Sequence, residues 1–379
     1  MSPARLTLFA PNLSGGGAER TLARLATRWA EQDCDVTLIT LAAVSPDDFP
    51  LPANVHRLGL ALTADSHGVL GAVRSNLRRI SAIRAAFVAA RPDVIVSFIE
   101  QANVLALLAA RTLDVPVVIS ERTDPSRHFA GRPWEFLRRR VYHRCAALVV
   151  LTEEIADSLR PIVHGRPVVV IPNGVATPRV GEEANGNDRR PLVTAVGRLD
   201  GAKGYDRLIE AFASIAGGHP EWRLTIVGEG PQRTVLQRQI IEAGLAERVE
   251  LVGRVSDPSD FFAKASLFVL PSRYEGFPNA LLEAMAAGLP AVAFDGPASV
   301  RQIVRDKVDG LLVPDGDVTA FAACLEELMQ DEELRRSLGA AARDVVDRFS
   351  LDAFFRRWDE LISSAVKTNF SQPSCLKSE

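Results

Sequence analysis

The sequence predicts an α/β protein made of two doubly wound parallel-sheet domains in series. Short β-branched runs alternate with helical patterns along the chain, and the runs are apolar at successive positions, as in parallel strands buried on both faces. One polar segment rich in glycine and proline, residues 174–191, interrupts this alternation. A chain of 379 residues is also longer than one hydrophobic core usually needs.

The first domain is expected over residues 1–173. Two segments, 18–32 and 73–90, carry apolar residues at three- and four-residue spacing, which is typical of helices that pack on a sheet. The strands between and around them are predicted at 6–10, 36–40, 55–60, 93–98, 115–120, 147–152 and 168–173.

Residues 174–191 are interpreted as a linker, and the second domain is expected over 192–349. A helix at about 350–368 is predicted to cross back to the first domain, and 371–379 is expected to be a loose tail. The strands of the second domain are predicted at 192–197, 223–228, 249–253, 267–272, 290–295 and 311–314, with helices at 205–216 and 280–288.

Composition excludes several classes of protein. The formal net charge of −3 favours no nucleic-acid partner, although residues 1–175 hold 20 arginines against 16 acidic residues, which leaves room for an anionic partner there. No apolar run reaches the ~20 residues that span a bilayer, and no signal peptide is recognisable. The setting is expected to be cytoplasmic, without zinc or disulfides, because no paired spacing joins the four cysteines, Cys34, Cys145, Cys324 and Cys375.

Glycines and cations follow the first strand of each domain, where open parallel sheets bind ligands. Gly16 and Gly17 run directly into a helix, an arrangement that lets backbone approach an anion, although a tight turn alone also explains them. Arg198 and Lys203 flank a glycine-rich turn and can direct two cations at one diphosphate; the alternative is two solvated surface charges. Gly228 and Gly230 lie between a later strand and its helix.

Two carboxylates, Glu275 and Glu283, surround a loop that opens a helix. Carboxylates accept hydrogen bonds from vicinal hydroxyls, so the pair suits a nucleotide-linked sugar. Glu283 alone is also explained by the favourable position of an acid in a first helical turn. The free N–H groups at this helix start are predicted to receive phosphate oxygens, and they belong to Asn279, Ala280 and Leu281.

These motifs together resemble the retaining glycosyltransferases of family GT4, whose GT-B fold has two Rossmann-like domains facing across a cleft. The resemblance runs from Phe9 to about Phe349 and rests on SGGGAER, GRLDGAKGYDRLIEAF, VGEGP, PSRYEGFPNALLEAMAAGLPAVAFD and DGLLVP. It implies that Arg198 and Lys203 hold the donor diphosphate, that Glu283 binds the ribose and Glu275 the donor sugar, and that Gly16 and Gly17 close over the phosphates. The same resemblance implies a donor-binding role for Gly228, Gly230, Asn279, Ala280 and Leu281.

The segment SERTDP at 120–125 is similar to a motif of family members that build bacterial capsule, O-antigen and lipid-linked oligosaccharides. Glu121, Arg122 and the following His128 are the acceptor-side candidates, and a salt bridge between Glu121 and Arg122 is the alternative. Two positions depart from the family pattern: many relatives have a histidine after this strand, and Gln302 stands where relatives often have a glutamate.

The predicted activity is retaining, metal-independent transfer of a hexose or N-acetylhexosamine from a nucleotide-diphosphate sugar, with UDP favoured, to a glycan acceptor carried on polyprenyl diphosphate. An epimerase or sugar phosphorylase of the same fold, or a noncatalytic sugar-nucleotide sensor, are the alternatives. No cofactor is expected, and the arginine, the lysine and the helix end make a metal unnecessary. Asp-x-Asp pairs occur at Asp33/Asp35 and Asp315/Asp317, and we interpret both as ordinary turns.

A peripheral contact with anionic lipid at the inner face of a membrane is also predicted. The segment 134–148 has a helical apolar stripe, formed by Trp134, Leu137, Val141, Cys145 and Leu148. Arginines cluster beside it and on the helix at 73–90, namely Arg138, Arg139, Arg140, Arg144, Arg74, Arg78, Arg79 and Arg84. Such surfaces adsorb to anionic headgroups, unless the stripe faces the domain core.

Overall fold

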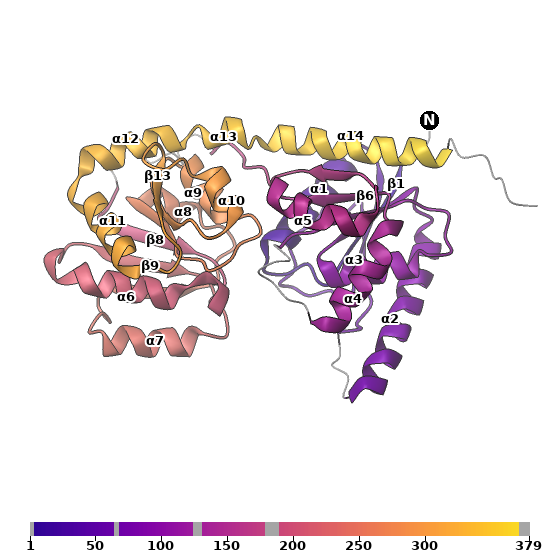
Figure 1. Ribbon diagram of the computed structural model, residues 1–379, viewed down its shortest axis with the longest axis horizontal. Helices are drawn as coiled ribbons and strands as arrows, with labels where there is room; N and C mark the ends of the chain where they lie inside the picture. The colour runs from indigo at the N-terminus through magenta and orange to yellow at the C-terminus, as the bar shows by residue number, and fades with distance from the viewer. Residues whose placement is uncertain (1–3, 64–67, 124–130, 179–188, 371–379) are drawn as a thin grey trace, which may run out of the picture. The chain divides into compact units, whose positions relative to one another are not determined.

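The chain forms two compact units in the computed structural model (Figure 1). The structure describes residues 4–63, 68–123, 131–178 and 189–370. The first unit runs to Pro172 and resumes at Ala353, while the second unit is Asn173–Asp352. Each unit is built on its own parallel sheet, which confirms the predicted fold class.

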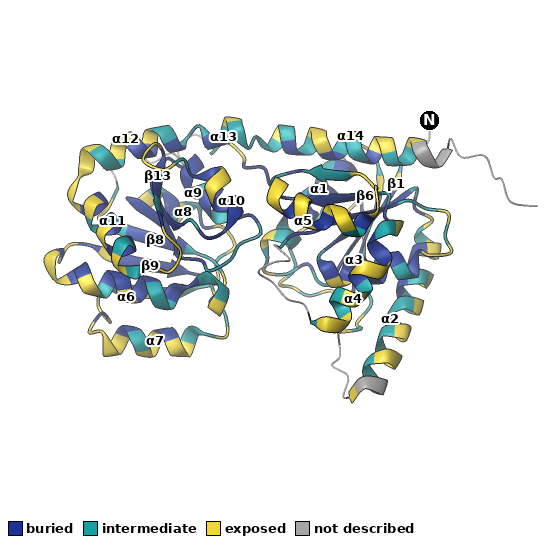
Figure 2. Ribbon diagram, viewed as in Figure 1, coloured by how far each residue is buried: buried dark blue, intermediate teal, exposed yellow. Residues whose placement is uncertain are grey.

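The first unit has a seven-stranded sheet in the order β3-β2-β1-β4-β5-β6-β7, and all its pairings are parallel. The central strands are buried along their whole length, as their continuous apolar runs predict (Figure 2). The strands are β1 (Arg5–Ala10), β2 (Asp35–Thr40), β3 (Val55–Gly59), β4 (Val94–Phe98), β5 (Val117–Ser120), β6 (Ala147–Val150) and β7 (Val168–Val170). The helices of this unit are α1 (Gly17–Glu31), α2 (Gly68–Ala90), α3 (Glu100–Ala109), α4 (Arg132–Val141), α5 (Glu153–Val163) and α14 (Leu351–Phe370).

The second unit has a six-stranded parallel sheet in the order β10-β9-β8-β11-β12-β13. Its strands are β8 (Leu192–Val196), β9 (Arg223–Val227), β10 (Val249–Gly253), β11 (Leu267–Leu270), β12 (Ala291–Phe294) and β13 (Gly310–Val313). Its helices are α6 (Tyr205–Ile215), α7 (Arg233–Glu242), α8 (Ser259–Lys264), α9 (Asn279–Ala286), α10 (Ala298–Ile303), α11 (Val318–Gln330), α12 (Glu332–Ala342) and α13 (Val345–Arg348), with a short 3-10 turn, η2, at Gly201–Lys203.

Each sheet has one point where the strand order reverses, between β1 and β4 in the first unit and between β8 and β11 in the second. At such a point the loops beyond the carboxyl ends of two neighbouring strands lead away in opposite directions and leave room for a ligand between them. The topology therefore brings together the loops after β8 and β11, which hold the strongest sequence motifs.

Helix α14 packs on the first unit although it follows the second in the sequence. Trp358 is fully buried and stacks on Phe98 at 5.6 Å between ring centroids. The same indole meets Trp29 edge to face at 6.3 Å, and the Trp29 Nε1–H donates to Asp359 at 2.8 Å. Aromatic contacts of this size anchor the helix that the sequence predicts at about 350–368.

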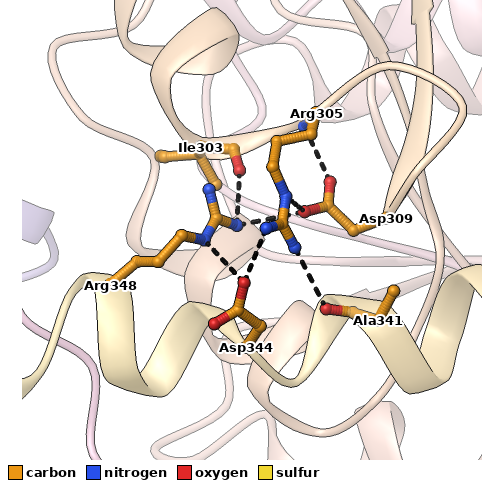
Figure 3. A network of polar contacts seen from close by, with 6 residues as sticks. All are labelled: Ile303, Arg305, Asp309, Ala341, Asp344 and Arg348. Atoms are coloured by element: carbon orange, nitrogen blue, oxygen red, sulfur yellow. Dashed lines mark hydrogen bonds and ion pairs between the residues drawn. The ribbon is translucent and has the colours of Figure 1, made fainter.

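A buried carboxylate organises the end of the second unit (Figure 3). Asp309 is fully buried and accepts hydrogen bonds from the backbone N–H and Nε of Arg305, at 2.7 and 2.6 Å, and from Arg348 at 3.1 Å. Arg305 also forms an ion pair with Asp344 at 2.7 Å, so two carboxylates face the two guanidinium groups. Arg348 also donates to the carbonyl oxygen of Ile303 at 2.9 Å. An isolated buried charge is costly, so Asp309 is stabilised by these arginines. Since Arg348 belongs to α13 and Asp309 to the loop before β13, their contact holds the two segments together.

The segment predicted as one amphipathic helix, 134–148, is not a single helix. Helix α4 ends at Val141, and after a 3-10 turn at Tyr142–Arg144 the chain enters β6, which contains Leu148. The end of the stripe is therefore in the core, with Val141, Cys145 and Leu148 all buried. Arg138 is buried as well, because it pairs with Glu135 at 2.5 Å and Glu100 at 3.8 Å, so it is not part of a surface cluster.

Across the residues that the structure describes, no helix combines the length and apolarity needed to cross a membrane.

Candidate active site

The candidate site of the second unit lies at the carboxyl ends of β8 and β11. The chain leaves β8 at Val196 and forms the turn that contains Lys203, and it leaves β11 at Leu270 and forms the loop that contains Glu275. The Lys203 ammonium lies 2.6 Å from Glu275 Oε1. Ser272, a buried residue between β11 and Glu275, donates to the same oxygen at 2.7 Å. The structure thus brings together two predicted site residues that are 72 positions apart.

Arg198 has a different partner from Lys203. Its guanidinium pairs with Asp200 at 2.6 Å, and its side chain is 70% exposed. Asp200 also accepts the N–H of Ala202 at 3.0 Å and so begins the 3-10 turn that carries Lys203. The turn therefore presents one exposed cation, Arg198, and one partly buried cation, Lys203, and its own aspartate orients the exposed one.

Arg273 fastens this turn to the loop after β11, a role that the sequence interpretation missed. Its backbone N–H donates to Ala202 at 2.8 Å, and its Nη1 donates to the carbonyl of Gly201 at 3.0 Å. The guanidinium also binds both oxygens of Asp206, at 2.8 and 2.6 Å. These hydrogen bonds lower the pKa of Asp206 and raise that of Arg273. No local signal could have found the pair, since 67 residues separate its members.

Gly228 and Gly230 allow two loops to pass each other closely. A Cβ on Gly228 would lie 1.9 Å from the carbonyl oxygen of Gly197, and a Cβ on Gly230 would lie 2.3 Å from that of Leu199. Both glycines therefore have a packing role in holding the loop after β9 against the loop after β8. Their predicted role in donor binding remains a prediction.

The start of α9 differs in one respect from expectation. The N–H of Leu281 donates to the carbonyl of Pro278 at 3.1 Å, so the prediction that this group is free is wrong: the first turn closes on the N-cap residue. Asn279 is oriented through its side-chain oxygen, which accepts from Asn173 at 2.7 Å. The phosphate-binding role of Asn279 and Ala280 remains a prediction. Glu283 lies one turn inside the helix and is half-buried.

In the first unit, Gly16 and Gly17 stand where β1 leads into α1, at the reversal point of that sheet. Gly16 is the extended N-cap residue of α1, and a Cβ there would lie 1.9 Å from the carboxylate of Glu19. The carbonyl of Gly17 accepts the Thr21 hydroxyl at 2.9 Å. Their closure over phosphates remains a prediction.

Glu121 and Arg122 follow β5, and both are buried. The Tyr142 hydroxyl donates to Glu121, and burial raises the pKa of this carboxyl to about 7. Arg122 lies over the Phe98 ring at 4.9 Å and has its pKa lowered by burial to about 9. Glu121 and Arg122 therefore contact different partners and do not form with each other the salt bridge that was considered as an alternative. His128 lies outside the described residues.

Comparison with known proteins places this geometry in a family. Residues 15–179 match the model described as Glycosyltransferase Family 4, and residues 180–345 match Glycosyl transferases group 1. The alpha-D-kanosaminyltransferase of Streptomyces kanamyceticus is 30% identical over 273 residues, which are 65% of this chain and 70% of that one. The chain belongs to the family 4 glycosyltransferases.

Two further relatives of this glycosyltransferase differ in how much of their length is matched. One from Campylobacter jejuni, named GalNAc-alpha-(1->4)-GalNAc-alpha-(1->3)-diNAcBac-PP-undecaprenol alpha-1,4-N-acetyl-D-galactosaminyltransferase, is 26% identical over 95% of this chain and 98% of its own. An exopolysaccharide phosphotransferase from Streptomyces coelicolor is 40% identical over 58% of this chain, but the match spans only 23% of that longer protein.

Solved structures confirm the GT-B fold of the glycosyltransferase. Sucrose-phosphate synthase from Thermosynechococcus elongatus superposes with a TM-score of 0.82 at 20% identity, covering 96% of this chain and all of that one. Anabaena HepE in complex with UDP-glucose gives a TM-score of 0.75 at 19% identity, covering 95% and 99%. At these identities the likeness concerns the fold.

One of the two Asp-x-Asp pairs of this glycosyltransferase, Asp315 and Asp317, has structural partners. Asp315 pairs with Arg207 at 3.3 Å, and Asp317 caps α11 by accepting the N–H of Ala320. Asp33 and Asp35 stand at the amino end of β2, the edge of the sheet opposite the reversal-point loops. Within the described ranges no cluster of three or more potential metal ligands occurs.

Proposed function

We propose that this glycosyltransferase transfers a hexose or N-acetylhexosamine from a nucleotide-diphosphate sugar, with UDP as the first candidate base, and retains the configuration at the anomeric carbon. The acceptor is a glycan carried on polyprenyl diphosphate, in the assembly of a bacterial surface polysaccharide or related glycan. In this reaction the acceptor oxygen bonds to the anomeric carbon on the face from which the diphosphate departs, and the diphosphate takes the acceptor proton. No metal takes part.

The contact between Lys203 and Glu275 carries the donor half of the proposal. An ammonium has three N–H donors, so Lys203 can bind a phosphate oxygen without leaving Glu275. Among the contacts of the described residues, both Lys203 and Ser272 use Glu275 Oε1, which leaves Oε2 to accept a hydrogen bond from a hydroxyl of the donor sugar. One carboxylate then links sugar recognition to the position of the cation that stabilises the leaving group.

The remaining donor contacts follow the family resemblance. Arg198, exposed and oriented by Asp200, is suited to bind the diphosphate with its planar fork. Glu283 binds the ribose, and the first N–H groups of α9 bind phosphate oxygens. Gly16 and Gly17 of the first unit contribute backbone to the phosphates. The Anabaena protein whose structure contains UDP-glucose supports UDP as the first nucleotide to test.

The acceptor half of the proposal rests on relatives and on the motif after β5. The Campylobacter jejuni relative, matched over nearly its whole length, is named for an undecaprenyl-diphosphate-linked glycan. Glu121 and Arg122 are both buried, so we assign them the role of supporting the acceptor-binding motif after β5. Direct contact with the acceptor is expected from the region of His128.

Thermal unfolding with UDP-, GDP- and ADP-sugars tests the donor assignment, because a ligand that binds only the folded protein raises its unfolding temperature with concentration. The NMR coupling of the product's anomeric proton then shows whether configuration is retained. Protection by no nucleotide sugar, with turnover that needs inorganic phosphate, would favour a phosphorylase. Conversion of the sugar without an acceptor indicates an epimerase, and binding without transfer or hydrolysis indicates a sensor.

The membrane contact is proposed for a smaller surface than the sequence predicted. On α4, Phe136 is 58% exposed and lies 4.9 Å below the Arg140 guanidinium, beside the exposed Arg139. On α2, exposed apolar and cationic positions adjoin, namely Val73, Arg74, Leu77 and Arg78. Exposed apolar side chains among arginines fit an anionic headgroup region on the cytoplasmic face.

Cosedimentation with anionic vesicles tests this surface. Replacing Arg74, Arg78, Arg139 and Arg140 by alanine should reduce binding strongly at low salt, at about 1 kcal/mol for each arginine near the headgroups. Arg138 is left intact because it is buried and pairs with both Glu100 and Glu135. Arg336→Ala, an exposed arginine of the second unit, is the control. Equal binding by all three proteins would leave a soluble acceptor as the better assignment.

A further inference from the structure

A hollow of about 400 Å³ opens at the amino-terminal edge of the first sheet. Its floor is apolar and includes Leu107 at the end of α3 and Val117 at the start of β5, both buried. The predicted acceptor motif begins at Ser120, at the other end of β5, so the hollow is separated from it by the length of the strand. The contact between Lys203 and Glu275 lies in the other unit.

Basic side chains, three arginines and one histidine, line the wall of this hollow, and none of the lining residues is acidic. They are Arg111 after α3, His143 and Arg144 after α4, and Arg166 before β7. Both burial and the neighbouring basic groups disfavour a positive charge on His143: burial lowers the pKa of its imidazole, and Arg144, His164 and Arg166 lower it further.

These arginines lack the partners that other arginines of the unit have. Arg57, Arg138 and Arg160 each pair with a carboxylate within 3 Å. In the part of the chain that the structure describes, no ion pair joins Arg111, Arg144 or Arg166 to a carboxylate. Positive charges grouped on a concave wall above an apolar floor raise the local positive potential. A bound anion would reduce the repulsion among these charges.

Arg166 is already oriented for such a ligand. Its Nε–H donates to the carbonyl oxygen of His143 at 3.1 Å, which fixes the plane of the guanidinium. The two terminal nitrogens remain to donate in parallel, the geometry in which arginine binds phosphate oxygens. His143 is itself held edge to face against His164, at 5.7 Å between ring centroids.

We propose that this hollow binds a phosphate-bearing anion through Arg111, Arg144, Arg166 and His143, at a site distinct from that of the sugar donor. The ligand is a free phosphate compound or the phosphate of an anionic lipid headgroup, since both present the same oxygens. The apolar floor accommodates the less polar part of an organic phosphate. The inference does not depend on the proposed function, because it uses no residue of the donor or acceptor machinery.

Histidine NMR on the full chain tests the site without interference from the donor pocket. Protein labelled at histidine Cε1 is titrated with inorganic diphosphate, and the His143 signal is assigned with His143→Gln. A bound anion should shift this signal along a saturable curve and raise the pKa of His143. Arg144→Gln and Arg166→Gln should each weaken the apparent affinity by about tenfold.

The control and the second ligand source decide the outcome. Arg160→Gln changes the same charge on α5 outside the hollow and should leave the curve unchanged. Vesicles containing phosphatidylglycerol should shift the same signal if a lipid headgroup is the ligand, and phosphatidylcholine vesicles should not. A His143 signal that stays unmoved through the millimolar range of diphosphate and with both kinds of vesicle overturns the site, as does an equal response in wild type and both pocket variants.

Discussion

The Lys203 ammonium and the Glu275 carboxylate are in direct contact at 2.6 Å, although 72 residues separate them in the chain. They meet because β8 and β11 are neighbours at the point where the strand order of the second sheet reverses. With Ser272 on the same oxygen, the contact is largely shielded from water: Glu275 is 9% and Lys203 23% exposed. A partly buried pair of this kind makes the two residues interdependent.

Lys203→Ala should reduce transfer by about 100-fold or more, because a cation facing the developing diphosphate charge is lost and Glu275 loses its partner. Glu275→Gln should also reduce transfer, and the double variant should lose less than the product of the two single effects. Steady-state kinetics on the three variants measure this coupling. Fully multiplicative effects would show that the pair does not act as a unit.

Glu283→Gln should weaken binding of the free nucleotide, whereas Glu275→Gln should leave that affinity nearly unchanged and lower turnover with the intact sugar nucleotide. The reason is that only Glu283 is proposed to contact the ribose. Calorimetric titration with UDP compares the two variants. If both lose UDP affinity to the same extent, the assigned division of roles is incorrect.

Arg273→Ala should raise the donor KM by about tenfold, because the turn that carries Lys203 loses its charge-assisted fastening to Asp206 and to Gly201. Arg273→Lys should recover only part of this effect, since an ammonium cannot reproduce the two parallel bonds to Asp206. The unfolding temperature should change little, because both side chains are about one third exposed or more. A large loss of stability with unchanged KM would make the role merely structural.

Activity should persist after EDTA treatment, since Arg198, Lys203 and the start of α9 are proposed to neutralise the departing diphosphate. The measurement is initial rate before and after chelation, followed by addition of Mg²⁺ or Mn²⁺. Loss of activity that either ion restores would establish a metal requirement and would return attention to Asp315 and Asp317.

The pKa of Glu121 predicts how stability depends on pH. Burial raises it from 4.5 to about 7, so the folded protein holds this proton more tightly than the unfolded chain does. The free energy of unfolding should therefore fall as pH rises from about 4.5 to about 7, by an amount on the order of 3 kcal/mol from this group. Denaturant unfolding across that range should show the decline in wild type and a flatter profile for Glu121→Gln.

Glu153→Gln is the matched control for this prediction, because Glu153 is 67% exposed on α5. It should keep the wild-type pH profile. A Glu121→Gln profile that declines as steeply as wild type would show that the pKa of Glu121 is not raised in the folded protein.

Much of the fold could be predicted from local sequence patterns. Continuous apolar runs such as 93–98 and 147–152 became buried central strands, because a segment apolar on every position needs cover on both faces. The loops after β8 and β11 were also singled out from the sequence, because glycines and charged residues directly after a parallel strand are typical of ligand-binding loops. The predicted end of the helix that contains α4 was wrong by several residues. The three- and four-residue apolar spacing continues past Val141 into β6, but the α-helical backbone ends at Val141.

The sequence by itself determined the alternation of strands and helices, the break between two sheets, and the motifs that place the chain among glycosyltransferases, because each of these depends on residues close together in the chain. Only the tertiary structure decided which of those motifs meet. The order of strands brought Glu275 to Lys203 and Arg273 to Asp206. It also turned Arg138 inward to two carboxylates, and grouped Arg144 and Arg166 at one hollow. Periodicity records which face of an element is apolar, whereas contacts between distant residues depend on which strand lies beside which.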